Sequence, residues 1–395
     1  MFLTRFRYCK PSDINEKGKK KGLNRMKKRL VSITLATTML LSLTACGSGN
    51  SGGAAGTAAP AAPETAAAGS EAGSEAGSQA AAGAEDYKGT VMLYSSTDEG
   101  VIIALKEAFE KKYPNVTLDY YAATSGKCVT KLATEFQSGT VACDLAWLAD
   151  PSAMITLKDD GNLLSYKSPY AEGIDGKFKD ADGYYCGARL LLMGVTFSTA
   201  TCSDEEAPTN YDGFLGESFK DQIVMTDPTG SGSTKALVYA LTNDSDYGWE
   251  YFEKLKEQGV ELQSSSGSTN NGIASGAYKL GFGVDYNTKN LMAEGSPLGW
   301  HDTKDIVAVP CPIGIPKGAP QEELAQLLYD FILDPEGGQA ILTQYNITPI
   351  VDGVALPDGM MKASEIANLA LPIDWVDLAA VSNELLDRFD AIFKN

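Results

Sequence analysis

The sequence predicts an α/β protein built of two lobes, and three observations lead to that prediction. Short apolar runs alternate with segments of helical periodicity, an order typical of a mostly parallel sheet with helices on both faces. About 310 residues follow Asp86, which is more than one hydrophobic core usually organises. Two long apolar runs, Cys186–Ser198 and Ile306–Ile315, bracket the middle of this part, so we expect two strands that cross between the lobes.

The first block is predicted to run strand, helix, strand. Val91–Tyr94 is apolar and is followed at once by polar residues, which indicates a buried strand that ends in a turn. Apolar residues then recur at helical spacing over 102–109. Pro114 ends this helix, because the residue before a proline disfavours helical geometry. Val116–Tyr121 is the second strand.

The same alternation continues through the middle of the chain. A second helix presents Val129, Leu132 and Phe136 on one face and ends at Gly139, a residue type that favours the left-handed conformation after a helix. Asp144–Leu148 is the third strand. A strand, two helices and a strand are then expected at Gln222–Met225, Lys235–Leu241, Trp249–Glu257 (closed by Gly259) and Tyr278–Val284.

Residues 1–45 have the features of a secretory signal peptide. A basic stretch precedes the apolar run Leu30–Leu43, which is shorter than the about 20 residues that a membrane-spanning helix needs. Whether translation starts at Met1 or Met26 stays open. The end of the run, Leu43-Thr44-Ala45-Cys46, resembles a bacterial lipobox, in which the cysteine is lipidated and becomes the first residue. The alternative is an ordinary signal peptide with an incidental cysteine.

The rest of the chain divides into a tether and three parts of a folded body. Residues 46–86 are predicted to be the lipidated Cys46 and a disordered tether, because Ala, Gly, Ser, Pro and Glu cannot bury enough apolar surface to offset the entropy of ordering. We assign 87–190 to the first part of lobe 1 and 191–308 to lobe 2. Residues 309–395 return to lobe 1 and end in helices, since apolar stripes run through this part.

Charge and cysteine content exclude several classes of partner. The net charge is −18, and it becomes −27 without residues 1–45, which hold eleven Lys/Arg and two Asp/Glu. So acidic a surface argues against nucleic acid and anionic lipid as direct partners. No CxxC spacing is present and His301 is the single histidine, so a Cys/His zinc site is not expected. Disulfide pairing stays open among Cys128, Cys143, Cys186, Cys202 and Cys311.

Four stretches of the chain resemble a known family. They are VMLYSSTDEGVIIALKEAFEKKYPNV, DPTGSGSTKALVYAL, ASGAYKLGFGVDYN and PIGIPKGAPQEELAQLLYDFILDPEGGQAIL. From about Lys88 to about Pro349 the chain resembles type II periplasmic binding proteins. It is most similar to the branch that serves ABC importers of ferric iron, thiamine, sugar phosphates and phosphonates. The resemblance implies two α/β lobes joined by crossover strands, with a ligand cleft between them that closes by a hinge.

Serine and threonine gather directly before predicted helices at four places. A helix N-terminus presents unpaired N–H groups and the positive end of the helix dipole, so it suits an anion, and hydroxyls add donors. Ordinary N-capping is the alternative for any one of them. No arginine lies near these loops in the sequence, so we expect backbone and hydroxyl groups to hold the oxyanion. The candidate ligand-binding residues are Ser95, Ser96, Thr97, Thr124, Ser125, Thr229, Ser231, Gly232, Ser233, Ser266 and Ser268.

Asp150, Asp285 and Tyr286 complete the candidate site. Asp150 follows the third strand, near the expected mouth of the cleft. Asp285 and Tyr286 end a strand of lobe 2, where ferric-iron relatives carry two adjacent tyrosines. A single tyrosine stands here, which puts iron in doubt. Asp285 is then a partner for sugar hydroxyls, an amine or a thiazolium, or it caps a turn.

These features favour a binding protein over an enzyme. G-x-S-x-G, H-E-x-x-H and P-loop motifs are absent from the sequence, and no cofactor or metal is predicted. We expect a monomeric lipoprotein on the outer face of the cell membrane that delivers a small anionic solute, such as a sugar phosphate, phosphonate or phosphate, to an ABC permease. Ferric iron and thiamine are the alternative ligands. A lipid-anchored hydrolase and a sensor partner are the alternative classes.

Overall fold

The computed structural model describes residues 83–394. The predicted signal peptide, Cys46 and all but the end of the predicted tether lie outside this range. Among the described residues, ten strands form one sheet, and no helix has the length and apolar character needed to cross a membrane. Along the sheet the order is β2 (Val116–Ala122), β1 (Gly89–Ser95), β3 (Leu145–Trp147), β10 (Val307–Pro316), β5 (Cys186–Ser198), β8 (Leu280–Val284), β6 (Ile223–Thr226) and β7 (Glu261–Gln263), while β4 (Leu163–Leu164) pairs with β10 and β9 (Leu298–His301) with β5.

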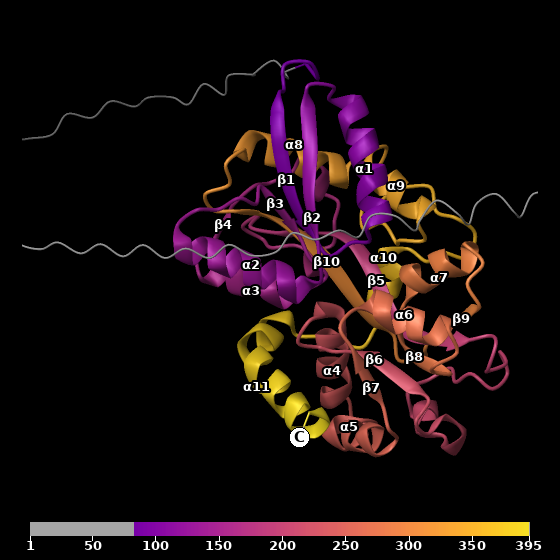
Figure 1. Ribbon diagram of the computed structural model, residues 1–395. Helices are drawn as coiled ribbons and strands as arrows, with labels where there is room; N and C mark the ends of the chain where they lie inside the picture. Colours follow the sequence, from indigo (N-terminus) through magenta and orange to yellow (C-terminus); the bar gives the residue numbers. More distant parts are fainter. Residues whose placement is uncertain (1–82, 395) are drawn as a thin grey trace, which may run out of the picture. The chain divides into compact units, whose positions relative to one another are not determined.

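The first lobe is built on β2, β1 and β3, which are parallel, with β10 antiparallel beside β3. Its helices are α1 (Glu99–Lys112), α2 (Ser125–Ser138), α3 (Pro151–Asp159), α8 (Glu322–Leu333) and α9 (Gly338–Gln344). Gly139 follows α2 with a φ of 71°, the left-handed C-cap that the sequence predicts. The rings of Phe109 in α1 and Phe331 in α8 meet edge to face at 5.3 Å, so the late part of the chain returns to this lobe (Figure 1).

The second lobe is built on β8, β6 and β7, which are parallel to one another. Its helices are α4 (Gly232–Asn243), α5 (Gly248–Glu257), α6 (Ser266–Ala274) and α7 (Asp285–Ala293). Aromatic rings fill its core, with Phe214 and Phe282 at 4.2 Å between centroids. The turn expected at the end of β8 is instead the first turn of α7, which begins at Asp285. Short 3-10 helices occupy Pro169–Ala171, Gly176–Phe178, Asp212–Leu215 and Glu217–Phe219.

Two strands pass between the lobes. All thirteen residues of β5 are buried, and the strand has the same bounds as the apolar run noted in the sequence. It pairs antiparallel with β10 on one side and with β8 on the other, so it joins the two halves of the sheet. The predicted α/β fold, with strands that cross between two lobes, is confirmed.

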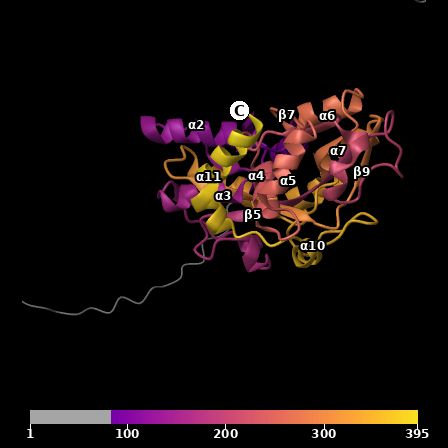
Figure 2. The same cartoon turned by 90° about the horizontal axis from the view of Figure 1, so that it is seen from below.

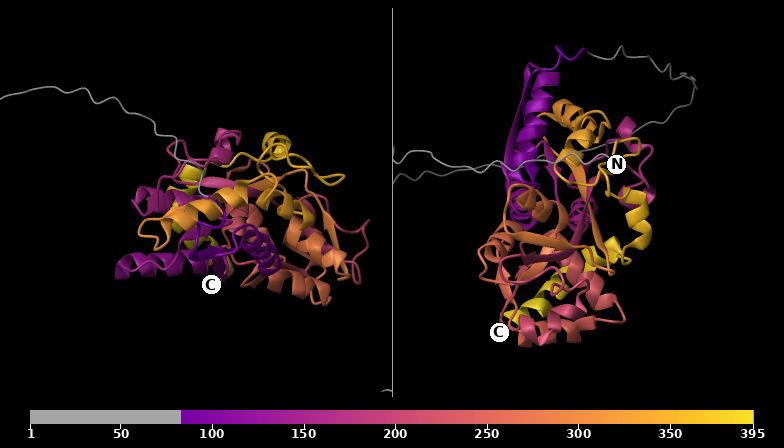
Figure 3. Two further views of the ribbon diagram at one scale, coloured as in Figure 1. Left: turned by 90° about the horizontal axis from the view of Figure 1, so that it is seen from above. Right: turned by 90° about the vertical axis from the view of Figure 1, so that its right-hand side faces the viewer.

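The chain ends in two helices, and the second of them contacts both lobes. They are α10 (Ala363–Leu369) and α11 (Trp375–Phe393). Helix α11 packs against α3 of the first lobe and against α4 and α5 of the second (Figure 2). The right-hand view of Figure 3 shows the C-terminus beside segments of the middle of the chain, which form the second lobe. Its ties to the second lobe include a hydrogen bond of 2.7 Å from the Tyr239 hydroxyl to Asp377. The end of the chain therefore touches lobe 2 as well as the lobe to which it was assigned.

Candidate ligand-binding cleft

A cavity of about 500 Å³ lies between the lobes. Within residues 83–394, the N-termini of α1, α2, α4, α6 and α7 all reach it, and β5 adds Arg189 and Leu191. The first N–H groups of a helix have no partner within the helix, and the helix dipole makes this end positive. Because five such ends meet here, the cavity favours a negatively charged or strongly hydrogen-bonding guest.

Arg189 is the main charged group of the cavity. Its side chain is 1% exposed and lies between two aromatic rings, 5.5 Å from the centroid of Trp147 and 4.9 Å from that of Tyr286. Nε and Nη1 have no hydrogen-bond partner. Burial lowers the pKa of Arg189, but surrounding ionisable groups, among them Asp98 and Asp285, raise it above its ordinary value. The guanidinium therefore stays charged, and two of its donors are unused.

A hydrogen bond and an irregularity in strand pairing lie beside Arg189. The indole Nε1 of Trp147 donates to the carbonyl oxygen of Cys311 at 3.0 Å, which fixes one of the two rings. The register between β5 and β10 shifts between Pro310 and Pro312, on the stretch of β10 that faces Arg189. Such irregularities re-aim side chains and are common beside functional sites.

Thr97 supplies a second unused donor. Its side chain is 4% exposed, lines the cavity and has no partner for Oγ1. Its backbone N–H donates to the hydroxyl of Ser95 at 3.0 Å, so the loop before α1 is held from within. Buried polar atoms in folded proteins are nearly always satisfied, and exceptions call for an explanation.

The lobes touch each other at the rim of the cavity. The N–H of Gly126 in α2 donates to the carbonyl oxygen of Gly230 before α4, at 3.2 Å. A Cβ at Gly126 would stand 2.8 Å from the carbonyl oxygen of Thr229, so this approach requires glycine. A second contact is a hydrogen bond from Asn287 to Asp98. Burial raises the pKa of Asp98, while Arg189 and Asn287 partly oppose that rise.

Eight of the residues predicted from sequence line this cavity. Four come from each lobe, and most belong to helix N-termini, as the argument from helix dipoles expects. Their role in binding stays a prediction. They are Ser96, Thr97, Thr124, Ser125, Ser231, Ser233, Ser266 and Tyr286.

Four other predicted residues do not line it, because each is engaged nearby. Ser95 is fully buried and accepts from Thr97. Thr229 donates to Asp227 at 2.6 Å. The N–H of Ser268 donates to the hydroxyl of Ser265, which caps α6. Asp285 is 2% exposed and accepts from the N–H of Leu192 at 3.1 Å, and burial raises its pKa to about 6.

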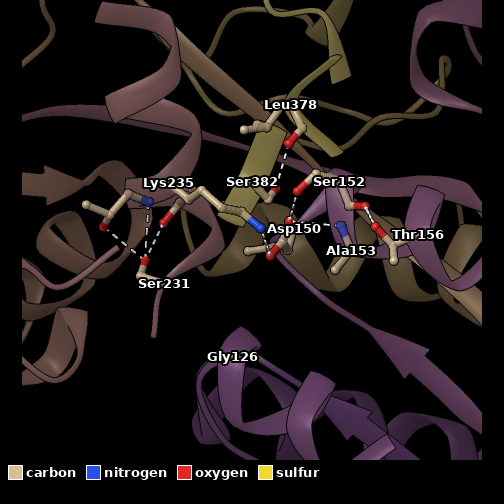
Figure 4. A network of polar contacts seen from close by, with 12 residues as sticks. Gly126, Asp150, Ser152, Ala153, Thr156, Ser231, Lys235, Leu378 and Ser382 are labelled. Carbon is tan, nitrogen blue, oxygen red and sulfur yellow. Dashed lines mark hydrogen bonds and ion pairs between the residues drawn. The ribbon is translucent and has the colours of Figure 1, made fainter. Parts of the chain in front are cut away.

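Asp150 and Gly232 meet in a different place, which we call the rear junction (Asp150, Gly232 and Lys235). Asp150 caps α3 through Ala153, accepts from the Ser152 hydroxyl at 2.7 Å and forms an ion pair of 2.9 Å with Lys235 of α4 (Figure 4). A Cβ at Gly232 would stand 2.4 Å from Cβ of Asp150. From the sequence we expected Asp150 at the mouth of the cleft. In the structure it does not line the cavity and instead forms an ion pair with Lys235 of the second lobe.

Arg189 is the charged residue of the cavity that the reasoning from sequence missed. No arginine lies near these loops in the sequence, but β5 brings Arg189 to the wall of the same cavity, although it is more than 30 residues away from each loop along the chain. The available signal was a single charged residue inside the apolar run CGARLLLMGVTFS. Charged residues are almost never fully buried without a role or a partner.

Comparison with known proteins identifies the family. Residues 104–368 match the family described as bacterial extracellular solute-binding protein, and the chain belongs to this family. Comparison with curated protein sequences gives no match. Members of such families bind small solutes outside the cytoplasm and work with a membrane permease. The chain is therefore a substrate-binding protein of an ABC importer.

Solved structures show the same fold at low sequence identity. A substrate-binding protein of an ABC transporter from Agrobacterium tumefaciens is 17% identical, with a TM-score of 0.69 over 78% of this chain and 94% of that one. AfuA from Actinobacillus pleuropneumoniae, with fructose-6-phosphate bound, is 19% identical, with a TM-score of 0.69 over 78% and 99%. Iron-bound HitA from Pseudomonas aeruginosa is 17% identical, with a TM-score of 0.66 over 77% and 99%. The predicted two-lobe fold is thus confirmed, and the ligands named belong to those proteins.

Proposed function

We propose that the cleft captures a small solute by an oxyanion group, such as a phosphate or phosphonate, and presents it to a membrane permease. The observation that carries the proposal is Arg189, a buried guanidinium with two unused donors in a cavity that five helix N-termini reach. A buried charge without a partner is costly, and an oxyanion is the partner that it lacks. The planar guanidinium suits phosphate oxygens, which it binds in a bidentate manner.

The size of the cavity agrees with such a solute. About 500 Å³ is within the range that small-molecule sites occupy, roughly 300–1,000 Å³. Hydroxyl groups of Ser96, Thr97 and Ser233 line the same space and are short enough for an oxyanion to approach the backbone. We assign no cofactor and no catalytic step to this site.

The same residues weigh against the two cationic alternatives. A ferric ion or the thiazolium of thiamine placed near Tyr286 would face the Arg189 guanidinium, 4.9 Å from that ring. Iron ligation by a tyrosine requires the phenolate, and burial raises the pKa of Tyr286. Among residues 83–394, no group of three or more His, Cys, Asp and Glu side chains is arranged to hold a metal ion.

The remaining parts of the proposal concern the N-terminal segment and the oligomeric state. We propose that Cys46 carries lipid and holds the protein at the outer face of the membrane, that residues 47–85 act as a tether, and that the protein works as a monomer. Cys46→Ser should then abolish partitioning into a detergent phase. Unchanged partitioning would contradict the anchor without affecting the cleft.

The test of the oxyanion proposal is a thermal-shift screen followed by calorimetry. The probes are inorganic phosphate, glucose 6-phosphate, methylphosphonate, thiamine and ferric citrate. A ligand at 100 times its dissociation constant should add about 2.7 kcal/mol of stability. We expect stabilisation by at least one phosphorylated probe and none by thiamine or ferric citrate.

Arg189→Met should then remove binding. Each hydrogen bond to a charged group contributes about 1.5–3 kcal/mol, so losing two weakens the affinity about a hundredfold or more. Arg388→Met is the matched control, because Arg388 also stacks on a tryptophan, 4.4 Å from the Trp249 ring, but lies on α11 outside the cleft. If Arg189→Met binds as tightly as the wild type, the oxyanion proposal is wrong.

A further inference from the structure

We infer that Asp98 sets the charge selectivity of the cleft, so that the preferred solute carries a protonated amine besides its oxyanion. This inference rests on the proposed function, since it assumes that the oxyanion binds at Arg189. Asp98 and Arg189 line the same cavity, yet no ion pair among residues 83–394 joins them. Each is close enough to shift the pKa of the other. A solute that lies between them meets a positive group at one end and a negative group at the other.

The side chain of Asp98 does not make the hydrogen bond that is usual for an aspartate at its position. Asp98 occupies the N-cap position of α1 but makes no capping hydrogen bond. Asp150 and Asp374, at the N-caps of α3 and α11, both accept from backbone N–H groups of their helices. A capping bond usually stabilises a helix, so its absence at Asp98 needs a reason. The carboxylate instead turns across the cleft, where Asn287 holds it.

The charges that line the cavity are balanced. Asp98 and Glu99 supply two negative charges, and Lys127 and Arg189 supply two positive ones. A bare dianion bound at Arg189 would face the Asp98 carboxylate without compensation, since like charges in a partly desolvated site repel strongly. An ammonium group on the solute lowers this excess of negative charge by one unit, because it pairs with Asp98. One carboxylate oxygen accepts from Asn287, and the other is available to the solute.

The test uses two compounds that differ by one ammonium group, O-phosphoethanolamine and ethyl phosphate. Their dissociation constants are measured by calorimetry with the wild type, with Asp98→Asn and with Asp374→Asn. Asparagine at 98 can still accept from Asn287, so the substitution removes charge and keeps the cross-cleft bond. Asp374→Asn is the matched control, because it makes the same change at an N-cap on α11, outside the cavity.

We expect the wild type and Asp374→Asn to bind O-phosphoethanolamine at least tenfold more tightly than ethyl phosphate. In Asp98→Asn this ratio should fall to about one, with ethyl phosphate bound more tightly than by the wild type. A ratio that Asp98→Asn leaves unchanged overturns the inference. The inference is also overturned if the wild type binds glucose 6-phosphate more tightly than O-phosphoethanolamine, because hydroxyl groups would then be the preferred partners of Asp98.

The outcomes separate this inference from the proposed function. If ethyl phosphate binds in a manner that depends on Arg189, and Asp98→Asn changes nothing, the oxyanion proposal stands and the inference alone falls. If neither compound binds the wild type, and no phosphorylated probe stabilises it, the oxyanion proposal fails and the inference fails with it.

Discussion

The two lobes meet at two places that treat buried charge in opposite ways. At the rear junction, Lys235 and Asp150 are paired at 2.9 Å, and Asp150 also accepts from Ser152 and Ala153. In the cleft, Arg189 is more deeply buried than either Lys235 or Asp150 but leaves Nε and Nη1 without partners. The paired charges complete a structural contact, whereas the unpaired charge is the one that we propose to bind the oxyanion of the solute. Satisfaction of hydrogen bonds, and not burial, therefore separates the structural contact from the binding site.

The largest effect on stability is expected at the rear junction. Lys235→Met leaves Asp150 buried without its cation, and breaking one partner of a buried pair typically costs about 3–5 kcal/mol. Arg189→Met should cost little or nothing without ligand, because no partner loses a bond. Denaturant unfolding of both variants measures the difference. Lys254→Met, which breaks an exposed ion pair with Glu250, is the control. If Lys235→Met and Arg189→Met lower the free energy of unfolding equally, the two buried charges do not differ in the way that their hydrogen bonds indicate.

The next effect comes from Asp285, a buried acid beneath the cleft. Its folded-state pKa is raised to about 6 from an ordinary 3.8, so ionisation is less favourable in the folded state. Stability should therefore fall as the pH rises from about 4 to about 6, by about 3 kcal/mol for a shift of about two units. Asp285→Asn should remove this part of the pH dependence and be the more stable protein at pH 8. If the free energy of unfolding depends on pH in the same way in the variant and in the wild type, Asp285 is not the source of this pH dependence.

A smaller effect is expected where the lobes touch at the cleft rim. Gly126→Ala places a Cβ 2.8 Å from the Thr229 carbonyl oxygen, which pushes the lobes apart. Because a ligand held by both lobes loses affinity when the closed form is less populated, we expect about tenfold weaker binding and an unchanged melting temperature. Gly100→Ala, where a Cβ meets nothing within 4 Å, is the control. A lower melting temperature with unchanged affinity would make the rim a structural contact like the rear junction.

The smallest effect should come from Ser231. Its hydroxyl caps α4 by accepting from the N–H of Thr234 at 3.3 Å and contacts the Ser233 hydroxyl at 3.1 Å. Ser231→Ala should therefore cost about 1 kcal/mol of stability, the usual value of an N-cap, and weaken oxyanion binding less than Arg189→Met does. Ser231→Thr, which keeps the cap, should restore the stability. If Ser231→Ala loses as much affinity as Arg189→Met does, the Ser231 hydroxyl binds the solute directly and is more than a helix cap.

Much of the fold was predictable because its signals are local. The run Cys186–Ser198 became β5 without change, because a mostly apolar run of thirteen residues is long enough to form a fully buried strand. Strands β4 and β7 were not predicted, because the first has two residues and the second, Glu261–Gln263, is mostly polar. Helix α7 was also missed. It starts at Asp285 directly after β8, and no turn residues lie between the two elements to mark the start of a helix in the sequence.

The candidate site was predictable only in the part that follows from helix starts. Ser125, Ser231 and Ser266 reach the cavity because helix N-termini in this fold point at it. For Arg189 the sequence holds one local signal, a charge inside an apolar run, but nothing local shows which loops it lies beside. The rear junction depends on how α3 and α4 pack, and the sequence distance from Asp150 to Lys235 carries no information about their contact.

The place of Arg189 on β5 bears on the order of events during capture. β5 is paired with β10 on one edge and β8 on the other, so it belongs to both halves of the sheet. If the solute binds Arg189 first, it is held by the strand that both lobes share, and this contact does not depend on the angle between the lobes. Binding of the oxyanion and closing of the lobes would then be separate steps, and diffusion of the solute into the open cleft would limit the first. Association should accordingly be fast, with the lobes mainly setting how long the solute stays.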